Sequence, residues 1–166
     1  PNNRDELMDD VDYYPDAYLD RMRREGVNGL WLTIDLPELG ERQYAKLRRT
    51  VEKCARHGIG VWIFGMEPRN RDARRHGPVC TSDPRNRAWL TDRFRDVFAA
   101  VPGLAGYIGI THGECTTSCL STVQPWEDKP ADCPLCGQLP NWRIHWNTLS
   151  AISEGVRAGN PEARTI

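Results

Sequence analysis

Three acidic residues of this sequence occupy equivalent positions. Asp35, Glu67 and Glu114 each follow a short, continuously apolar run by one to three residues. Facing carboxylates suit glycosidic cleavage, because one acid protonates the leaving oxygen while a second group stabilises or attacks the oxocarbenium-like centre. A single acid at such a position is equally well explained as a cap for the next helix. The three acidic residues together, more than any one of them, indicate a catalytic site, and Glu114 is the candidate general acid.

Polar and aromatic residues near the same runs are candidates for binding a sugar. His112 stands two residues before Glu114, so in a continued strand both side chains would point to the same side. Trp126 lies in the long loop that follows and suits stacking on a sugar ring. Trp31 and Trp62 are instead expected in the core, because they sit inside apolar runs. The predicted substrate-binding set is Asp35, Glu67, Arg69, His112 and Trp126.

Four of the six cysteines form two close pairs in one Pro- and Thr-rich segment, which we treat as a loop insertion at 112–140. Cys115 and Cys119 are separated by three residues, Cys133 and Cys136 by two, and 13 residues lie between the pairs. Two such pairs bring four thiolates around one Zn²⁺. The spacing favours a structural zinc site of Cys115, Cys119, Cys133 and Cys136, because four thiolates leave no coordination position for substrate.

Two other interpretations of the cysteines stay open. They are a pair of disulfides in an exported protein and an iron–sulfur site. A radical-type cluster would need three cysteines in one tight run, which the sequence lacks. Cys54 lies on an apolar helical face and is expected in the core, whereas the pattern assigns no role to Cys80. Zinc-bound thiolates would favour a cytoplasmic location.

The elements that must position these residues alternate between amphipathic helices and buried strands. Strands that are apolar on both faces and alternate with helices predict a parallel α/β sheet. No apolar run is followed by a Gly-rich phosphate turn, which favours part of a (β/α)₈ barrel over a doubly wound sheet. The predicted helices lie at 15–26, 44–58, 82–101 and 142–159, and the predicted strands at 29–34, 59–64, 105–111 and from 163 onward.

The segments 14–32, 58–69 and 80–84 resemble uncharacterised bacterial glycoside-hydrolase-like barrels, and the similarity extends over nearly the whole chain. Those proteins are more distantly similar to the β-N-acetylhexosaminidase type of barrel. The resemblance implies that the strands seen here are the second, third and fourth, with Glu114 at the general-acid position ending the fourth. Gly113 replaces the Asp that orients the acetamido group in that family, so substrate-assisted cleavage is not implied. In the commoner retaining barrels the nucleophile comes from the seventh strand.

Composition excludes several other classes of protein. The 22 basic and 23 acidic residues give a net charge of −1, which argues against a general nucleic-acid binder. The sequence has neither an apolar run long enough to span a membrane nor a signal-like start. The chain 1–166 is therefore expected to be about half of a barrel that acts on a carbohydrate and packs against its own missing C-terminal half. The alternatives are a non-catalytic carbohydrate-binding barrel and a zinc-loop interaction module.

Overall fold

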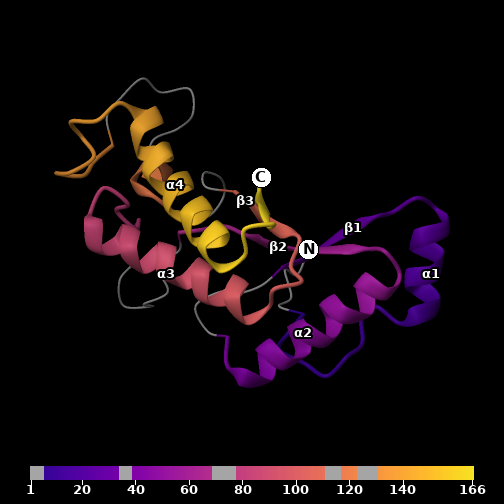
Figure 1. Ribbon diagram of the computed structural model, residues 1–166. Coiled ribbons are helices and arrows are strands. Elements are labelled where there is room, and N and C mark those ends of the chain that lie inside the picture. Colours follow the sequence, from indigo (N-terminus) through magenta and orange to yellow (C-terminus); the bar gives the residue numbers. More distant parts are fainter. Residues whose placement is uncertain (1–5, 34–38, 69–77, 111–116, 123–130) are drawn as a thin grey trace.

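The computed structural model describes residues 6–33, 39–68, 78–110, 117–122 and 131–166. Within these ranges helices and strands alternate along the chain (Figure 1). The helices are α1 (Asp16–Arg24), α2 (Glu41–Arg56), α3 (Pro84–Ala100) and α4 (Asn141–Gly159), with a short 3₁₀ helix, η2 (Cys119–Thr122). The strands are β1 (Gly29–Thr33), β2 (Gly60–Gly65), β3 (Gly106–Gly109) and β4 (Arg164–Thr165).

The strands form one parallel sheet in the order β1-β2-β3-β4, which is also their order in the sequence. Trp31 pairs with Trp62, Ile63 with Tyr107, and Tyr107 with Thr165. Each connection between neighbouring strands contains a helix, as parallel pairing requires. All strands therefore run toward the same edge of the sheet, where β1 ends at Thr33, β2 at Gly65 and β3 at Gly109.

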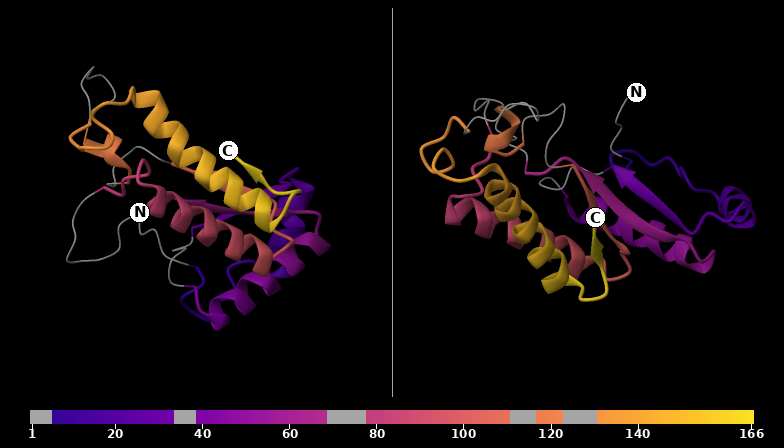
Figure 2. Two further views of the ribbon diagram at one scale, coloured as in Figure 1. Left: turned by 60° about the vertical axis from the view of Figure 1, so that its left-hand side comes forward. Right: turned by 90° about the horizontal axis from the view of Figure 1, so that it is seen from above.

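The four helices bury their apolar sides in one core on a single face of this sheet (Figure 2). The strands contribute Leu32, Val61, Ile63 and Tyr107, all at most 2% exposed. The rings of Phe94 in α3 and Tyr107 in β3 pack edge to face with centroids 4.6 Å apart, a favourable aromatic geometry. The helical members of the same core include Leu19, Leu47, Phe94 and Ile152, one from each helix.

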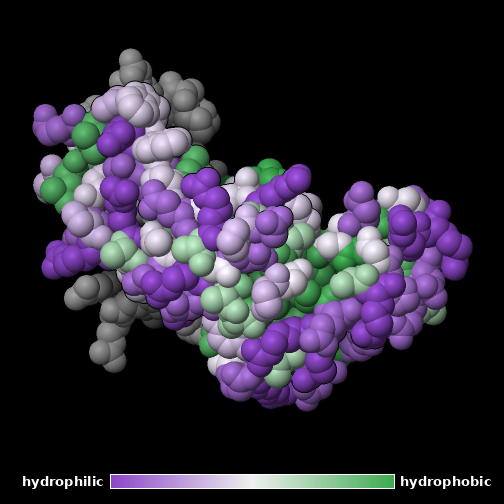
Figure 3. All heavy atoms as spheres, viewed as in Figure 1, coloured by the Kyte–Doolittle hydropathy of each residue, from purple (hydrophilic) through white to green (hydrophobic). Residues whose placement is uncertain are grey.

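The one-sided arrangement decides between the two predicted architectures. A doubly wound sheet carries helices on both faces, whereas the wall of a (β/α) barrel carries them only outside. The predicted α/β fold with parallel strands, as part of a (β/α)₈ barrel, is therefore confirmed. In the space-filling view, hydrophobic residues lie near the centre and are flanked by hydrophilic residues of the helices (Figure 3). None of the described helices is long and apolar enough to cross a bilayer.

Local sequence signals set the helix boundaries. The Asp83 side chain accepts a hydrogen bond from the backbone N–H of Arg85 at 2.9 Å, so Asp83 caps α3 and Pro84 fills its first position. Gly26 and Gly58 follow α1 and α2 with φ of 84° and 68°. These left-handed conformations suit glycine and turn the chain out of each helix into the next strand.

His57 joins the C-terminal end of α2 to α1. Its Nε2 lies 2.8 Å from Oδ1 of Asp16 and its Nδ1 lies 2.9 Å from Oδ1 of Asp20. A neutral imidazole donates from only one ring nitrogen, whereas the imidazolium donates from both. The hydrogen bond to Asp16, helped by that to Asp20 and opposed by burial, raises the pKa of His57 above its usual value.

We expect this bridge to make stability depend on pH. Because the folded pKa of His57 is raised, its contribution is complete below the unfolded pKa of about 6.5 and is lost as pH rises through the folded value. His57→Gln should therefore lower the melting temperature more at about pH 5.5 than at about pH 9. Thermal unfolding of both proteins followed by circular dichroism measures this, and an equal decrease at the two pH values would contradict it.

Candidate functional site

The carboxyl edge of the sheet is the place where the predicted catalytic and binding residues should meet. Of these residues, only Glu67 is described. The structure places it directly after β2, where a cis peptide bond joins it to Pro68. The other predicted residues of this site lie outside the described ranges: Asp35, Arg69, His112, Glu114 and Trp126.

Glu67 is buried beside the end of β2 and near the side chain of Tyr107 in β3. Only 2% of its surface is exposed, and a Cβ placed on Gly65 would lie 3.9 Å from its Cγ. The same Cβ would lie 3.3 Å from the hydroxyl of Tyr107, which donates a hydrogen bond to the carbonyl oxygen of Gly65 at 3.0 Å. A glycine at position 65 therefore leaves room for the tyrosine and the glutamate to meet at the end of β2.

The electrostatics of this contact favour a neutral tyrosine. Burial raises the pKa of Tyr107 well above its usual value, and the charge of Glu67 adds to that shift. A hydrogen bond from the backbone of Glu67 opposes it. Tyr107 is therefore a hydrogen-bond donor that fixes the strand end, while Glu67 brings a carboxylate to the base of the predicted site.

Aromatic residues occupy the sheet face opposite the helices. Trp31 is 58% exposed and stacks on Phe64, with centroids 5.5 Å apart. Trp62 is half-buried beside Trp31 in the strand register. The prediction that Trp31 lies in the core is wrong. Its side chain points to the sheet face that the helices leave uncovered. In a closed barrel this face lines the interior.

Four cysteines from three segments converge beside the starts of α3 and α4. The Sγ atoms of Cys80, Cys119, Cys133 and Cys136 all lie within 4.8 Å of one another. Cys119 and Cys136 are buried, and Cys80 and Cys133 are half-buried. Three of these residues belong to the predicted zinc set, and its fourth member, Cys115, lies outside the described ranges. The group could bind a metal ion, so we refer to it as the four-cysteine cluster.

The cluster perturbs the ionisation of its own thiols. Burial, reinforced by the thiols of Cys136 and Cys133, raises the pKa of Cys80 to about 11. Burial also raises the pKa of Cys119. For Cys133, hydrogen bonds from the backbones of Cys136 and Leu135 and from neighbouring thiols outweigh the effect of burial and lower the pKa to about 7. Among the thiols of the cluster whose pKa is shifted, that of Cys133 is the most acidic.

Cys80 is the member that sequence reasoning missed. Spacing identifies cysteines that lie close together in the sequence, and Cys80 has no such partner. A topological signal was nevertheless present. Cys80 lies between β2 and α3, Cys119 lies between β3 and α4, and neighbouring parallel strands place such connections side by side.

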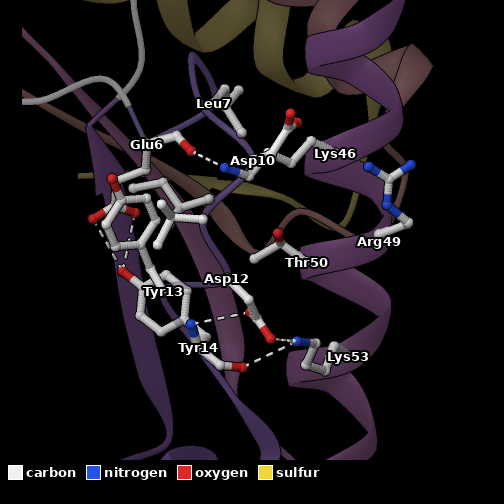
Figure 4. Close-up of a pocket in the computed structure, with 12 residues that line it drawn as sticks. Glu6, Leu7, Asp10, Asp12, Tyr13, Tyr14, Lys46, Arg49, Thr50 and Lys53 are labelled. Atoms are coloured by element: carbon white, nitrogen blue, oxygen red, sulfur yellow. Dashed lines mark hydrogen bonds and ion pairs between the residues drawn. The ribbon is translucent and has the colours of Figure 1, made fainter.

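A separate hollow lies between the N-terminal segment 6–14 and α2 (Figure 4). Two lysines of α2 bind this segment across the hollow: Nζ of Lys53 lies 2.6 Å from Oδ2 of Asp12, and Nζ of Lys46 lies 2.7 Å from the carbonyl oxygen of Asp9. Arg42 and Asp10 form a further ion pair at 2.8 Å. These contacts tie segment 6–14 to α2 and give the hollow a structural role.

Neither a protein-family model nor a curated protein matches this sequence. Solved structures do match the fold. One is a GH5_18 variant from Streptomyces cattleya in complex with Manb1-4GlcNAc, with a TM-score of 0.56, 13% identity, and coverage of 91% of this chain and 38% of that chain.

A GH5_18 variant from Bifidobacterium longum subsp. longum, also in complex with Manb1-4GlcNAc, has a TM-score of 0.52 and 11% identity. The match covers 85% of this chain and 34% of that one, so this chain spans about a third of the length of these neighbours. At such identity the likeness concerns the fold alone, and it does not confirm the β-N-acetylhexosaminidase type. The chain shares with these structures a fold that corresponds to part of a (β/α) barrel.

Proposed function

We propose that this chain is part of a (β/α)₈ glycoside hydrolase in which Glu114 is the general acid. The observation that carries the proposal is the parallel pairing of β1, β2 and β3, because each of these strands is followed in the sequence by a carboxylate residue. The fold shared with GH5_18 structures supports the same class of reaction.

In the proposed reaction, the carboxyl proton of Glu114 moves to the glycosidic oxygen as the bond from that oxygen to the anomeric carbon breaks. A second carboxylate, which we assign to a later strand of the barrel, attacks the anomeric carbon in a retaining mechanism or activates a water molecule in an inverting one. The separation of the two carboxyl groups decides between these outcomes.

The remaining predicted residues have roles in binding. Asp35, Arg69 and His112 would hydrogen-bond sugar hydroxyls, and the indole of Trp126 would stack on a sugar face. Glu67 is 2% exposed and lies beside Gly65 at the end of β2, which favours a positioning role at the base of the site. Gly113, which precedes Glu114, provides no carboxylate for an acetamido group, so we favour a mechanism in which the enzyme supplies both catalytic groups.

The candidate cofactor is a structural Zn²⁺ in the four-cysteine cluster. Four thiolates would fill a tetrahedral coordination shell, so the metal would support the fold and leave catalysis to the carboxylates. Thiolates that hold a metal ion suit a reducing compartment, which favours a cytoplasmic location.

Hydrolysis itself is the first test. The longest reading frame that encodes this chain should be expressed and incubated with aryl glycosides and with β-linked oligosaccharides, including Manb1-4GlcNAc, the ligand of the GH5_18 neighbours. We expect release of the aglycone or of a reducing sugar from at least one substrate. Saturable sugar binding, measured calorimetrically, without turnover of any substrate would instead identify a non-catalytic carbohydrate-binding barrel.

A further inference from the structure

The four-cysteine cluster joins parts of the chain that are distant in the sequence. Cys80 precedes α3, Cys119 begins η2, and Cys133 and Cys136 precede α4. These segments lie together at one end of the α3–α4 pair (Figure 1). Beside the cluster, the backbone N–H of Val79 donates to the carbonyl oxygen of Thr117 at 2.7 Å, and Val79 forms a parallel bridge with Ser118. The backbone thus already pairs the connection after β2 with the connection after β3.

The sulfur positions fit a single tetrahedral metal ion. Sγ of Cys80 lies 3.6 Å from Sγ of Cys136 and 3.7 Å from Sγ of Cys133. A tetrahedron with Zn–S bonds of about 2.3 Å has sulfur–sulfur edges of about 3.8 Å. These distances exclude disulfides between the measured pairs, since a disulfide bond is about 2.05 Å long. In an iron–sulfur cluster with several irons, each thiolate binds a different iron atom, so the sulfurs lie far apart. The four sulfurs here lie within 4.8 Å of one another, which favours one shared metal ion.

Two of the ligand segments form hydrogen-bonded turns. The first turn follows Cys80, where the N–H of Asp83 donates to the carbonyl oxygen of Cys80 at 3.2 Å. The second turn follows Cys133 and contains Cys136, so this short segment carries two of the four sulfurs.

Gly137 closes the second turn. Its N–H donates to the carbonyl oxygen of Cys133 at 2.7 Å, and a Cβ at position 137 would lie 3.0 Å from that oxygen. Around the first turn, the hydroxyl of Ser82 lies 3.2 Å from both Sγ of Cys136 and Nδ2 of Asn147 in α4. Both turns are therefore held in place by the protein itself, as a preformed metal site requires.

We propose that one Zn²⁺ is bound by Cys80, Cys119, Cys133 and Cys136. The ion links the connection after β2 to the connection after β3. The inference assigns Cys80 as the fourth ligand and leaves Cys115 outside the coordination shell. Among the described residues, the apolar cluster around the sulfurs is small and includes, besides the cysteines, Leu120, Ala131, Leu139 and Ile144. The metal would thus supply much of the cohesion at this end of the molecule.

Metal content tests the assignment without reference to hydrolysis. The longest reading frame that encodes the chain should be purified without chelator and analysed by plasma mass spectrometry. We expect about one zinc per chain, at least a tenfold loss in Cys80→Ser, and no change in Cys115→Ser. Cys54→Ser is the matched control, because Cys54 is a buried cysteine of the α2 core outside the cluster. Zinc retained in Cys80→Ser and lost in Cys115→Ser would overturn the assignment.

X-ray absorption at the zinc edge identifies the ligand atoms directly. It is made on the wild-type protein and on Cys80→His, so it still tests the proposal if Cys80→Ser does not fold. The wild-type spectrum should fit four sulfur atoms at about 2.3 Å. Cys80→His, which replaces one ligand type with another, should fit three sulfurs and one nitrogen. Four sulfurs in the Cys80→His protein would refute the proposal. Iron in place of zinc would also refute the proposal. A wild-type protein without metal would refute it as well, both if its cysteines react with a thiol reagent after denaturation and if they do not react because they form disulfides.

Discussion

Replacing Glu114 with Gln is expected to slow hydrolysis of glycosides with poor leaving groups by about 10²–10⁴-fold. Gln has the size of Glu, but its amide has no acidic proton that can be transferred to the departing oxygen. Activated aryl glycosides, whose phenolate leaves without protonation, should lose far less. The values of kcat/KM across a series of leaving groups measure this contrast, because kcat/KM reports bond cleavage to the leaving group and excludes later steps.

Glu154→Gln is the matched control for this experiment. Glu154 is an exposed residue of α4 on the helical layer, so the substitution should change neither class of substrate. The leaving-group dependence should become much steeper only in Glu114→Gln. An equal loss on activated and poor substrates would remove the acid role of Glu114 and indicate that this residue contributes to substrate binding or to folding.

Much of the fold could be predicted because its signals are local. The segment 82–84 predicts the start of α3, and Asp83 does cap that helix. The glycines at 26 and 58 predict the ends of α1 and α2, and both adopt a positive φ there. The segment 159–161 predicts the end of the fourth helix, and α4 does end at Gly159, with Asn160 as its cap.

The features that the sequence did not predict depend on contacts between distant segments. Cys80 joins the cysteine cluster only because β2 and β3 are neighbours in the sheet, and spacing within one loop does not reveal this. The exposure of Trp31 depends on which face of β1 the helices cover. An apolar residue in a strand indicates that one face of the strand is buried. Which face is buried depends on where the helices pack.

Gly155 and Gly159 allow α3 and α4 to approach closely, and enlarging either residue should destabilise the protein (Figure 2). A Cβ at position 155 would lie 2.4 Å from the carbonyl oxygen of Thr91 and 2.7 Å from Cβ of Phe94. A Cβ at position 159 would lie 2.4 Å from the carbonyl oxygen of Arg95. These atoms belong to or adjoin the α3 backbone, so no side-chain rotation relieves the overlap.

Gly155→Ala is therefore expected to lower the free energy of unfolding although alanine is the better helix former. The gain in helix propensity is about 1 kcal/mol. Separating the helices costs about 1–3 kcal/mol, and more when several core contacts loosen together. Residues Ile152 and Val156, both buried in the common core, flank the contact and would move with α4. We expect a net loss of about 1 kcal/mol and a decrease in melting temperature of about 2–4 °C.

Thermal unfolding of four variants tests this packing: Glu154→Ala, Gly155→Ala, Gly159→Ala and the double glycine change. Glu154→Ala, at the exposed neighbouring position of α4, should leave the melting temperature unchanged or raise it slightly. Gly155→Ala combined with Gly159→Ala should cost less than the sum of the single changes, because α4 needs to move away from α3 only once. Full additivity would show that the two contacts yield independently, and an unchanged Gly155→Ala protein would mean that the helices do not pack at this distance in solution.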